Sequence, residues 1–219
     1  MEIEFWQQRW DLDQIAFHLP TVNPHLVSFL EKFNISPSSQ IFIPLCGKSL
    51  DITWLASHNY SVIGIECSNK AIVDFFQEQG IESETKDVSK FISHQAKNIQ
   101  LLQGDFFDLD QKLLKDISLL YDRASLIALP FDKRKQYVNL LSNILPSDSQ
   151  ILLITLEYDQ NIMSGPPFSV SNNEVKALYE DKYNIDILHE DDVIEGYKTF
   201  KQRGLGSLVE RVYKLSLKI

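Results

Sequence analysis

From residue 40 onward, short apolar runs alternate with segments in which apolar residues recur at helical spacing. Each run is four to six residues long, which is too short for a helix and typical of a buried strand. The intervening segments repeat apolar residues at intervals of three and four, as amphipathic helices do. This alternation predicts a parallel sheet with helices on its faces. The runs are residues 41–45, 61–65, 99–102, 117–121 and 151–156.

The pattern of apolar residues changes near the C-terminus. Residues 184–189 and 208–215 have strand character, and the segment between them contains glycines but no helical pattern. An antiparallel hairpin is the natural end for such a sheet. The chain is therefore expected to form a single domain over residues 1–219, an α/β fold with a doubly wound, mostly parallel seven-stranded sheet and a C-terminal antiparallel hairpin. Residues 82–98 are polar and are expected to form an excursion or an extra helix.

The first two runs enclose a turn and a helix, and the second run ends in an acid. Gly47 supplies the turn, a helix follows up to His58, and Glu66 comes nineteen residues after Gly47. In a unit of strand, helix and strand, this spacing puts the Glu66 carboxylate beside the glycine turn, where it can accept hydrogen bonds from both ribose hydroxyls of an adenosine. The pattern favours a nucleoside site over an ordinary charged residue at a strand end.

The glycine pattern narrows the choice of nucleoside. A dinucleotide site requires G-x-G-x-x-G so that the backbone can approach a pyrophosphate. Here Gly47 stands alone, and Leu45, Cys46 and Lys48 fill the neighbouring positions. The phosphate-loop pattern G-x-x-x-x-G-K-[ST] is also missing from the sequence. An adenosine cofactor without phosphates fits this turn best, and S-adenosylmethionine is the common one.

Length, composition and charge indicate the size of the core, the classes of partner and the location of the protein. With 219 residues, 44% of them hydrophobic, the chain can bury one large core. A formal net charge of −9 argues against nonspecific nucleic-acid binding, which needs a basic surface. No apolar run reaches the roughly 18 residues that span a bilayer, and the acidic, aromatic start MEIEFWQQRW does not resemble a signal peptide. We expect a cytoplasmic monomer without membrane or nucleic-acid partners.

Cysteine and histidine give no sign of a metal site. The five histidines show neither H-E-x-x-H nor a Cys/His ligand spacing. Cys46 and Cys67 are expected at the ends of neighbouring strands, within potential reach of a disulfide. In a reducing cytosol, two free thiols near the site are the better interpretation.

Aromatic residues dominate the N-terminus. Phe5, Trp6, Arg9 and Trp10 share one face of a short helix. Such a stripe is most often core packing. Because aromatic faces attract a sulfonium cation as they attract an ammonium, residues 1–38 are interpreted as a helical lid over the cofactor site.

Two further regions lie where parallel strands are expected to end. The fourth run leads into Arg123, and a stiff loop, residues 163–168, follows the fifth run. Ligands of doubly wound sheets bind at the carboxyl ends of the strands, so both regions are expected to face the crevice. Phe106 follows the third run and is a candidate to flank an adenine, although a buried core phenylalanine is at least as good an interpretation.

Six short motifs occur in one order along the chain: Phe5-Trp6-x-x-Arg9-Trp10, Ile15-x-Phe17-His18, Pro44-Leu45-Cys46-Gly47-Lys48-Ser49-Leu50-Asp51, Gly104-Asp105-Phe106-Phe107, Tyr121-Asp122-Arg123-Ala124 and Gly165-Pro166-Pro167-Phe168. Together they closely resemble the thiopurine S-methyltransferase family, particularly its bacterial members. The resemblance covers nearly the whole chain. It implies a Rossmann-like class I methyltransferase fold that uses S-adenosylmethionine.

Carried over by position, the resemblance implies which residues contact the cofactor. Glu66 would hold the ribose, Leu45 with its turn would face the methionine part, and Phe106 would lie against the adenine. The full set of implied cofactor residues is Trp10, Leu45, Gly47, Glu66, Phe106 and Arg123.

The resemblance also implies an acceptor site and a reaction. Phe17 would line the acceptor pocket, and Arg203 would approach the acceptor alongside Arg123. The reaction would move a methyl group from S-adenosylmethionine to the sulfur of a thiopurine or a similar aromatic or heterocyclic thiol. The acceptor reacts as a thiolate, which a nearby arginine favours without acting as a base. Ion pairs at the surface or the sheet end are the alternative role for both arginines.

Three other functions fit parts of the pattern. A methyltransferase of selenium or tellurium compounds, halide or small aliphatic thiols would keep the same cofactor site and differ in its acceptor pocket. A noncatalytic protein that binds S-adenosylmethionine would transfer no methyl group. A nicotinamide oxidoreductase is disfavoured by the missing glycines around Gly47.

Overall fold

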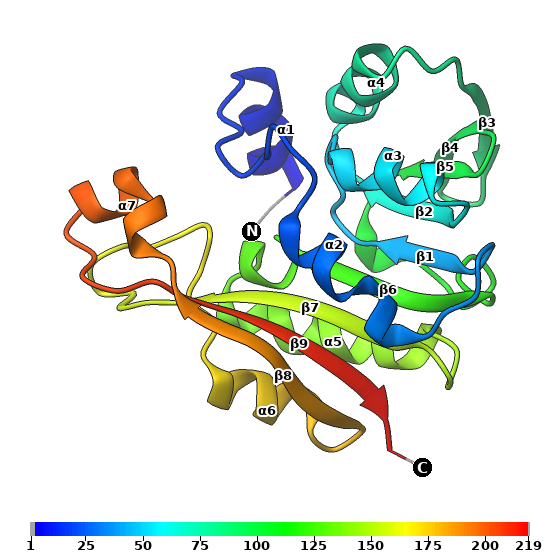
Figure 1. Cartoon of the computed structure of the whole chain (residues 1–219). Coiled ribbons are helices and arrows are strands. Elements are labelled where there is room, and N and C mark those ends of the chain that lie inside the picture. The colour runs from blue at the N-terminus through cyan, green and yellow to red at the C-terminus, as the bar shows by residue number, and fades with distance from the viewer. Residues whose placement is uncertain (1–2, 219) are drawn as a thin grey trace. The chain divides into compact units, whose positions relative to one another are not determined.

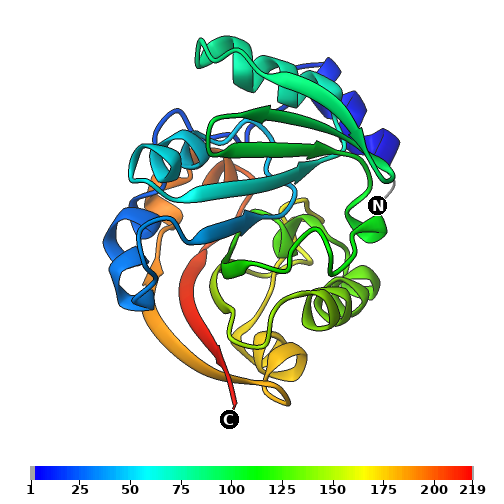
Figure 2. The same cartoon turned by 90° about the vertical axis from the view of Figure 1, so that its right-hand side faces the viewer.

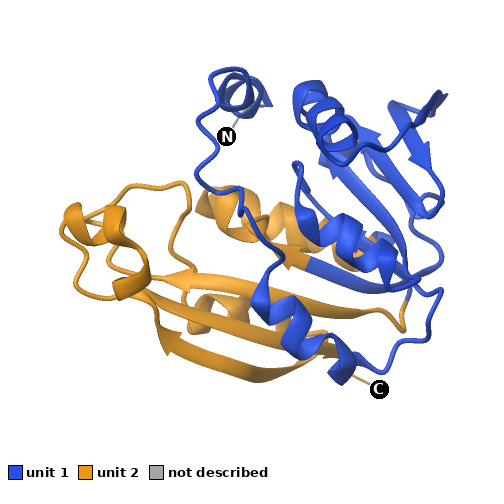
Figure 3. Ribbon diagram, turned by 45° about the horizontal axis from the view of Figure 1, so that its top comes forward, with its two compact units in different colours: residues 1–121, 144–146 blue, residues 122–143, 147–219 orange. Residues whose placement is uncertain are grey.

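The computed structural model describes residues 3–218. This part of the chain divides into two compact units, which Figure 3 shows in blue and orange and which are described one at a time. Unit 1 contains the residues up to 121 together with residues 144–146, and unit 2 contains residues 122–143 and those from 147 onward. The expected single domain stays a prediction. No helix within the described residues is long and apolar enough to cross a membrane.

Unit 1 is built on a mostly parallel sheet of apolar strands. β1 (Gln40–Ile43) pairs in parallel with β2 (Ser61–Glu66) and with β6 (Ile117–Arg123), and β2 pairs in parallel with β5 (Ile99–Gln103). Buried side chains fill nearly every position of β1 and β2, as in strands that are covered on both faces. Figures 1 and 2 both show these strands side by side. The parallel α/β fold predicted from the alternating pattern is confirmed.

Two short strands that the sequence did not predict extend this sheet beyond β5. β3 (Glu84–Val88) and β4 (Phe91–Ala96) form an antiparallel hairpin, and β4 pairs antiparallel with β5. Residues 82–98 are thus neither a helix nor a loose excursion, and the described part of the chain has nine strands rather than the expected seven. The hairpin escaped prediction because β3 is an exposed, polar edge strand and because polar Ser93 and His94 are buried in β4.

Serine caps begin the two helices that pack against β2. The Ser49 hydroxyl accepts a hydrogen bond from the N–H of Asp51 at the start of α3 (Leu50–Ser57), and Ser68 caps α4 (Asn69–Glu78) in the same way. Each helix starts shortly after the carboxyl end of a strand, which brings both N-termini to the same edge of the sheet. The other helices of this unit are α1 (Ile3–Asp11), α2 (Pro24–Phe29), and the 3-10 helices η1 (Leu30–Phe33) and η2 (Phe106–Asp108).

A buried carboxylate connects the N-terminal segment to the sheet of unit 1. Asp51 is 2% exposed, and its Oδ1 accepts a hydrogen bond from the backbone N–H of Asn23 at 2.8 Å. Its Oδ2 accepts a hydrogen bond from the Tyr121 hydroxyl of β6 at 3.0 Å. Both oxygens are therefore paired, which offsets the cost of burying the charge. This network fixes the start of α2 to β6.

Unit 2 contains the antiparallel strands. β9 (Val209–Leu217) lies between β7 (Gln150–Glu157) and β8 (Tyr183–Asp192) and is antiparallel to both. The antiparallel pairing predicted from residues 184–189 and 208–215 is confirmed, with longer strands, but the segment between them, in which no helix was expected, contains η4 (Ile194–Gly196) and α7 (Lys198–Gln202). The helices of unit 2 are α5 (Phe131–Ile144, whose last residue belongs to unit 1), α6 (Asn172–Tyr179), α7 (Lys198–Gln202), and the 3-10 helices η3 (Leu126–Ala128) and η4 (Ile194–Gly196).

Candidate functional site

Glu66 lies at the carboxyl end of β2, beside the Gly47 turn, and is 5% exposed. The backbone N–H of Gly47 donates to Oε2 at 3.0 Å, while the N–H of Ser68 (2.8 Å) and the Cys67 thiol (3.3 Å) donate to Oε1. The backbone N–H of Cys67 also donates to this carboxylate, so its roughly four lone-pair sites are occupied, and a ligand hydroxyl would replace one of these donors. Burial raises the pKa of Glu66, and these hydrogen bonds act in the opposite direction.

The turn after β1 brings the backbone against an aromatic ring. Gly47 has a φ of +52°, and a Cβ at this position would lie 2.8 Å from Cζ2 of Trp10. Trp10, on α1, is 2% exposed. Leu45 is half-buried and also has a positive φ, of 45°. The first turn, the strand-end acid Glu66 and the N-terminal helix therefore meet within unit 1.

Phe17 joins this group through aromatic contacts. Its ring packs edge-on against Trp10, with centroids 5.5 Å apart, and against Trp6 at 5.6 Å. Phe17 is half-buried. The aromatic stripe is thus connected to the glycine turn through Trp10, whereas its role as a lid stays a prediction.

Phe106 lies in the loop that follows β5. This loop adjoins Glu66 through the backbone, since the Gly104 N–H donates to the Glu66 carbonyl at 3.0 Å. The Phe106 ring is 3% exposed and packs edge-on against Phe107 at 5.4 Å. The loop lies where the sequence predicted, and the ring itself is part of the core.

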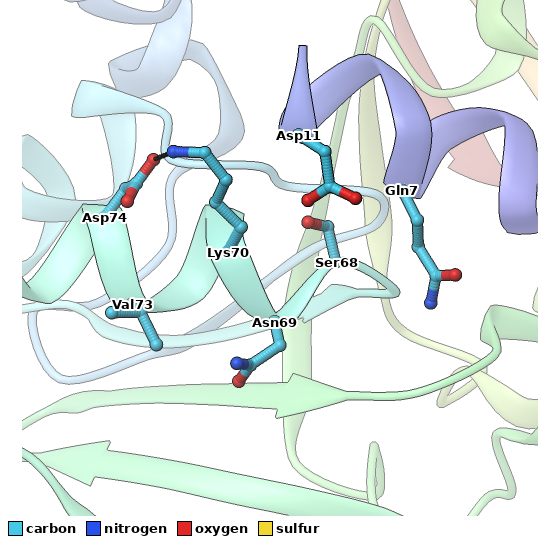
Figure 4. A pocket seen from close by; sticks show the side chains of 7 residues that line it. All are labelled: Gln7, Asp11, Ser68, Asn69, Lys70, Val73 and Asp74. Atoms are coloured by element: carbon cyan, nitrogen blue, oxygen red, sulfur yellow. Dashed lines mark hydrogen bonds and ion pairs between the residues drawn. The ribbon is translucent and has the colours of Figure 1, made fainter. Parts of the chain in front are cut away.

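A hollow of about 340 Å³ lies between α1 and the start of α4. Gln7 lines it from α1, and Ser68 and Asn69 line it from α4 (Figure 4). Ser68 connects the hollow to the acid, because its N–H donates to Glu66, although Glu66 does not itself line the hollow. Sequence reasoning named none of these lining residues. Their position in the sequence could have indicated them, because residues that directly follow a strand-end acid lie at the ligand-binding edge of the sheet.

The two predicted arginines belong to unit 2. Arg123 is the last residue of β6 and is half-buried, and Arg203 is the exposed C-cap of α7. Burial and the charge of Glu210 raise the pKa of Tyr197, while the charge of Arg123 lowers it. Tyr197 directly precedes α7. Arg123 therefore lies near the start of the short helix whose C-cap is Arg203.

The loop of residues 163–168 is tied down within unit 2. The Phe168 N–H donates to the carbonyl of Ile127 in η3 at 2.6 Å. The Tyr158 hydroxyl donates to the Pro167 carbonyl. These bonds connect the loop to the segment that follows Arg123 and to the end of β7.

Arg134 anchors the far end of this loop, and sequence reasoning missed it. It is 2% exposed on α5, and its Nε donates to the Leu129 carbonyl at 2.9 Å. Its Nη1 donates to the Ser169 carbonyl at 3.1 Å and pairs with the Glu174 carboxylate at 2.7 Å. One buried guanidinium thus joins η3, the loop and α6. A single arginine inside a polar helix carries no sequence signal for these long-range partners.

Both cysteines are free thiols next to the Glu66 carboxylate. Burial and the negative charge of Glu66 raise the pKa of Cys46 and of Cys67, which disfavours their thiolates. Within residues 3–218, no group of three or more His, Cys, Asp and Glu side chains is arranged to hold a metal ion.

Comparison with known families identifies the chain. The family sequence model described as "Thiopurine S-methyltransferase (TPMT)" matches residues 1–218. This chain belongs to the thiopurine S-methyltransferase family. A thiopurine S-methyltransferase of Pseudomonas putida is 44% identical over 216 residues, which cover 99% of this chain and 100% of that protein. A probable thiopurine S-methyltransferase of Yarrowia lipolytica is 46% identical over 218 residues, with coverage of 99% and 100%.

Solved structures agree on the fold. The Burkholderia thailandensis 1,6-didemethyltoxoflavin-N1-methyltransferase, crystallised with S-adenosylhomocysteine, is 10% identical with a TM-score of 0.66, and the match covers 99% of this chain and 87% of that one. A SAM-dependent methyltransferase from Anabaena variabilis is 13% identical with a TM-score of 0.62, over 99% and 95% of the two chains. This family member is therefore a class I methyltransferase that uses S-adenosylmethionine and methylates sulfur.

Proposed function

We propose that this family member transfers the methyl group to the sulfur of a thiopurine or a similar aromatic or heterocyclic thiol. The observation that carries the proposal is the position of Phe17. Its half-buried ring lies against Trp10, which in turn lies on the Gly47 turn. A flat heteroaromatic acceptor gains apolar and edge-on ring contacts there. These rings offer no polar contact to a hydrated oxyanion of selenium or tellurium, so such an acceptor would depend on Arg123 and Arg203 alone.

Unit 1 contains side chains that suit S-adenosylmethionine. Glu66, at the strand end beside the glycine turn, is the acceptor that we assign to the ribose hydroxyls, and Gly47 and Trp10 pack against each other beside it. The cofactor contacts that we assign are Trp10, Leu45, Gly47, Glu66, Phe106 and Arg123.

When bound, the cofactor supplies a methyl group on a positively charged sulfur. The task of the protein is then to hold the acceptor sulfur in line with that methyl group, and alignment of two reactants contributes about 7–11 kcal/mol. Phe17 orients the acceptor ring. Arg123 and Arg203 lower the pKa of the acceptor thiol through their positive charges, so its proton leaves to water and neither arginine acts as a base.

The proposal also covers the domain organisation, the location and the partners of the protein. The chain acts as one domain over residues 1–219, with residues 1–38 as a lid, and as a cytoplasmic monomer whose partner is a small thiol. The net charge of −9 supports the absence of nucleic-acid partners. The hydrogen bond between Asp51 and Asn23 supports the lid. It fixes the segment after α1 at Asn23, and residues 12–22 connect α1 to this fixed point.

Release of S-adenosylhomocysteine with 6-mercaptopurine as acceptor tests the proposal. We expect saturable release with this thiol and slower release with selenite, tellurite and small aliphatic thiols. Release that is fastest with one of these other acceptors would contradict the proposed acceptor class. No release from any acceptor, with S-adenosylhomocysteine still binding in calorimetry, would contradict it as well.

The Phe17→Ala variant examines the observation that carries the proposal. Loss of the ring contact should raise KM for 6-mercaptopurine roughly three- to tenfold, in line with about 0.5–1.5 kcal/mol for an aromatic pair. The affinity for S-adenosylhomocysteine should stay the same. The control Phe131→Ala removes a ring that is 71% exposed on α5 and should leave both constants unchanged. An unchanged KM in Phe17→Ala would show that Phe17 does not line the acceptor pocket.

A further inference from the structure

The turn that carries Arg123 is closed by the side chain of its neighbour. Asp122 is fully buried, and its Oδ1 accepts a hydrogen bond from the N–H of Leu126 at 3.1 Å. The backbone N–H of Ser125 donates to the same carboxylate. Ala124, between them, has a φ of +64°, a conformation that a residue with a Cβ adopts only under constraint. The carboxylate supplies that constraint.

A second element holds the other carboxylate oxygen. Tyr137 of α5 is fully buried, and its hydroxyl donates to Oδ2 of Asp122 at 2.7 Å. Successive residues of a strand point to opposite faces. The Asp122 side chain therefore points toward α5, and Arg123, at the next position, points to the opposite side, where it is half-buried near Tyr197.

The same turn leads into the loop of residues 163–168. Leu126, which donates to Asp122, is the first residue of η3, and the carbonyl of Ile127 accepts the N–H of Phe168. One carboxylate thus orders both Arg123 and the attachment point of Phe168, two of the segments that matched the family motifs. All of these residues belong to unit 2.

We propose that Asp122 is a positioning residue of this methyltransferase: held by Tyr137, its ionised carboxylate closes the turn that presents Arg123 to the cofactor and the acceptor. This inference rests on the proposed function, which gives Arg123 that role. A protonated Asp122 would become a donor on one oxygen and compete with the Tyr137 hydroxyl, so the turn would loosen and Arg123 would lose its orientation.

The charge on Asp122 is sensitive to pH in the range where the enzyme is assayed. Burial raises the pKa of Asp122 to about 6, against hydrogen bonds from Tyr137, Leu126 and Ser125 that lower it. The titratable groups that interact with it are Tyr137 of α5 and Tyr179 of α6. Burial raises the pKa of both tyrosines well above the ordinary value, so both stay neutral while Asp122 titrates. Activity should therefore fall as pH drops through about 6.

Two variants and a matched control test the proposal through kcat, KM and the pH profile with 6-mercaptopurine. Asp122→Asn removes the charge and should lower kcat roughly 10- to 100-fold, as misplacement of a reacting group does. Its remaining activity should show no fall near pH 6. Tyr137→Phe removes the bond that favours the ionised form, so the acidic fall should move upward by about half a pH unit or more.

Tyr179→Phe is the control. Tyr179 is also a fully buried tyrosine near Asp122, but its hydroxyl has no hydrogen-bond partner among residues 3–218, so its loss should leave the pH profile in place. Ionisation of the acceptor thiol affects every variant equally, so differences between profiles report on the protein. If Asp122→Asn does not fold, the conservative Tyr137→Phe decides the question alone.

Profiles of Asp122→Asn and Tyr137→Phe that superimpose on the wild-type profile would overturn the proposal. If the wild-type protein methylates no thiol, the proposed function fails, and the same four proteins are compared by calorimetric binding of S-adenosylhomocysteine between pH 5 and 8. Weaker binding below pH 6 that disappears in Asp122→Asn would then support the positioning role. Identical binding curves would reject it.

Discussion

At the scale of single residues, the site depends on buried carboxylates whose hydrogen bonds come from other parts of the chain. Glu66, Asp51 and Asp122 are each at most 5% exposed. Each holds backbone N–H groups or a tyrosine hydroxyl in place. Removing such a carboxylate leaves those donors unpaired as well as deleting a charge. Single substitutions should therefore have large and separable effects.

The Glu66→Gln variant should weaken S-adenosylhomocysteine binding roughly 10- to 100-fold. The amide turns one acceptor oxygen into a donor that faces the N–H of Gly47 or of Ser68, and a bond to a charged acceptor is worth about 1.5–3 kcal/mol. Isothermal calorimetry measures the dissociation constant. Glu82→Gln, an exposed position outside the site, should bind as the wild type does. Equal constants for all three proteins would refute the ribose assignment.

The Arg203→Ala variant should lower kcat/KM for the thiol acceptor roughly tenfold, because one of two charges that favour the thiolate is lost. Arg203 is exposed, so the melting temperature and the affinity for S-adenosylhomocysteine should not change. Steady-state kinetics and a thermal melt provide the measurement. Lys201→Ala removes an exposed charge from the same helix and is the control. A lower melting temperature with unchanged kinetics would make Arg203 structural.

At the scale of elements, α1 and the turn after β1 interlock. The absence of a side chain at Gly47 makes room for the Trp10 ring, and Trp10 in turn supports Phe17. A substitution in the turn should therefore alter the packing of α1 and of the Trp10 and Phe17 rings, although these elements are far apart in sequence.

The Gly47→Ala variant tests this coupling. A new Cβ would lie 2.8 Å from the Trp10 ring, so the indole must move. Tryptophan emission should shift to longer wavelength and S-adenosylhomocysteine binding should weaken. Gly80→Ala is a matched control, because Gly80 also has a positive φ (+62°) but nothing lies within 4 Å of its Cβ position. Both variants should lose about 1–2 kcal/mol of stability from the left-handed backbone, and only Gly47→Ala should change emission and binding. Equal effects in both would deny the coupling.

At the scale of the whole molecule, buried ionised carboxyl groups make the stability depend on pH. The pKa of Asp122 is raised from 3.8 to about 6 in the folded protein. A raised pKa means that the folded state binds the proton more tightly than the unfolded state does. The corresponding stabilisation is complete below pH 4 and is lost as pH rises through about 6. Neutral pH thus carries a penalty on the order of 3 kcal/mol from this one group.

Urea denaturation between pH 5 and 7.5 should therefore show a free energy of unfolding that decreases with pH in the wild type. Asp122→Asn cannot ionise and should show a weaker decrease over the same range. The raised pKa of Glu66 acts in the same direction in both proteins, so the difference between the two curves isolates Asp122. Parallel curves would show that Asp122 has an ordinary pKa.

The sequence predicted features that depend on neighbours along the chain. The spacing from Gly47 to Glu66 located the strand-end acid, and the run at 151–156 located β7. It did not predict β3 and β4, since a polar edge strand lacks an apolar period. It also could not reveal the partners of Asp51, Asp122 or Arg134, because hydrogen bonds between distant residues leave no local pattern.

The β3–β4 hairpin has a consequence for the behaviour of the protein at high concentration. β3 presents the exposed charges of Glu84, Lys86 and Asp87 at the outer edge of its sheet. Charged edge strands discourage pairing with strands of other molecules. If a shortened chain lacked residues 82–98, the mostly buried β5 would become an open edge, able to add strands from further copies. We therefore expect the hairpin to protect the enzyme from aggregation, a role for which its polar sequence is well suited.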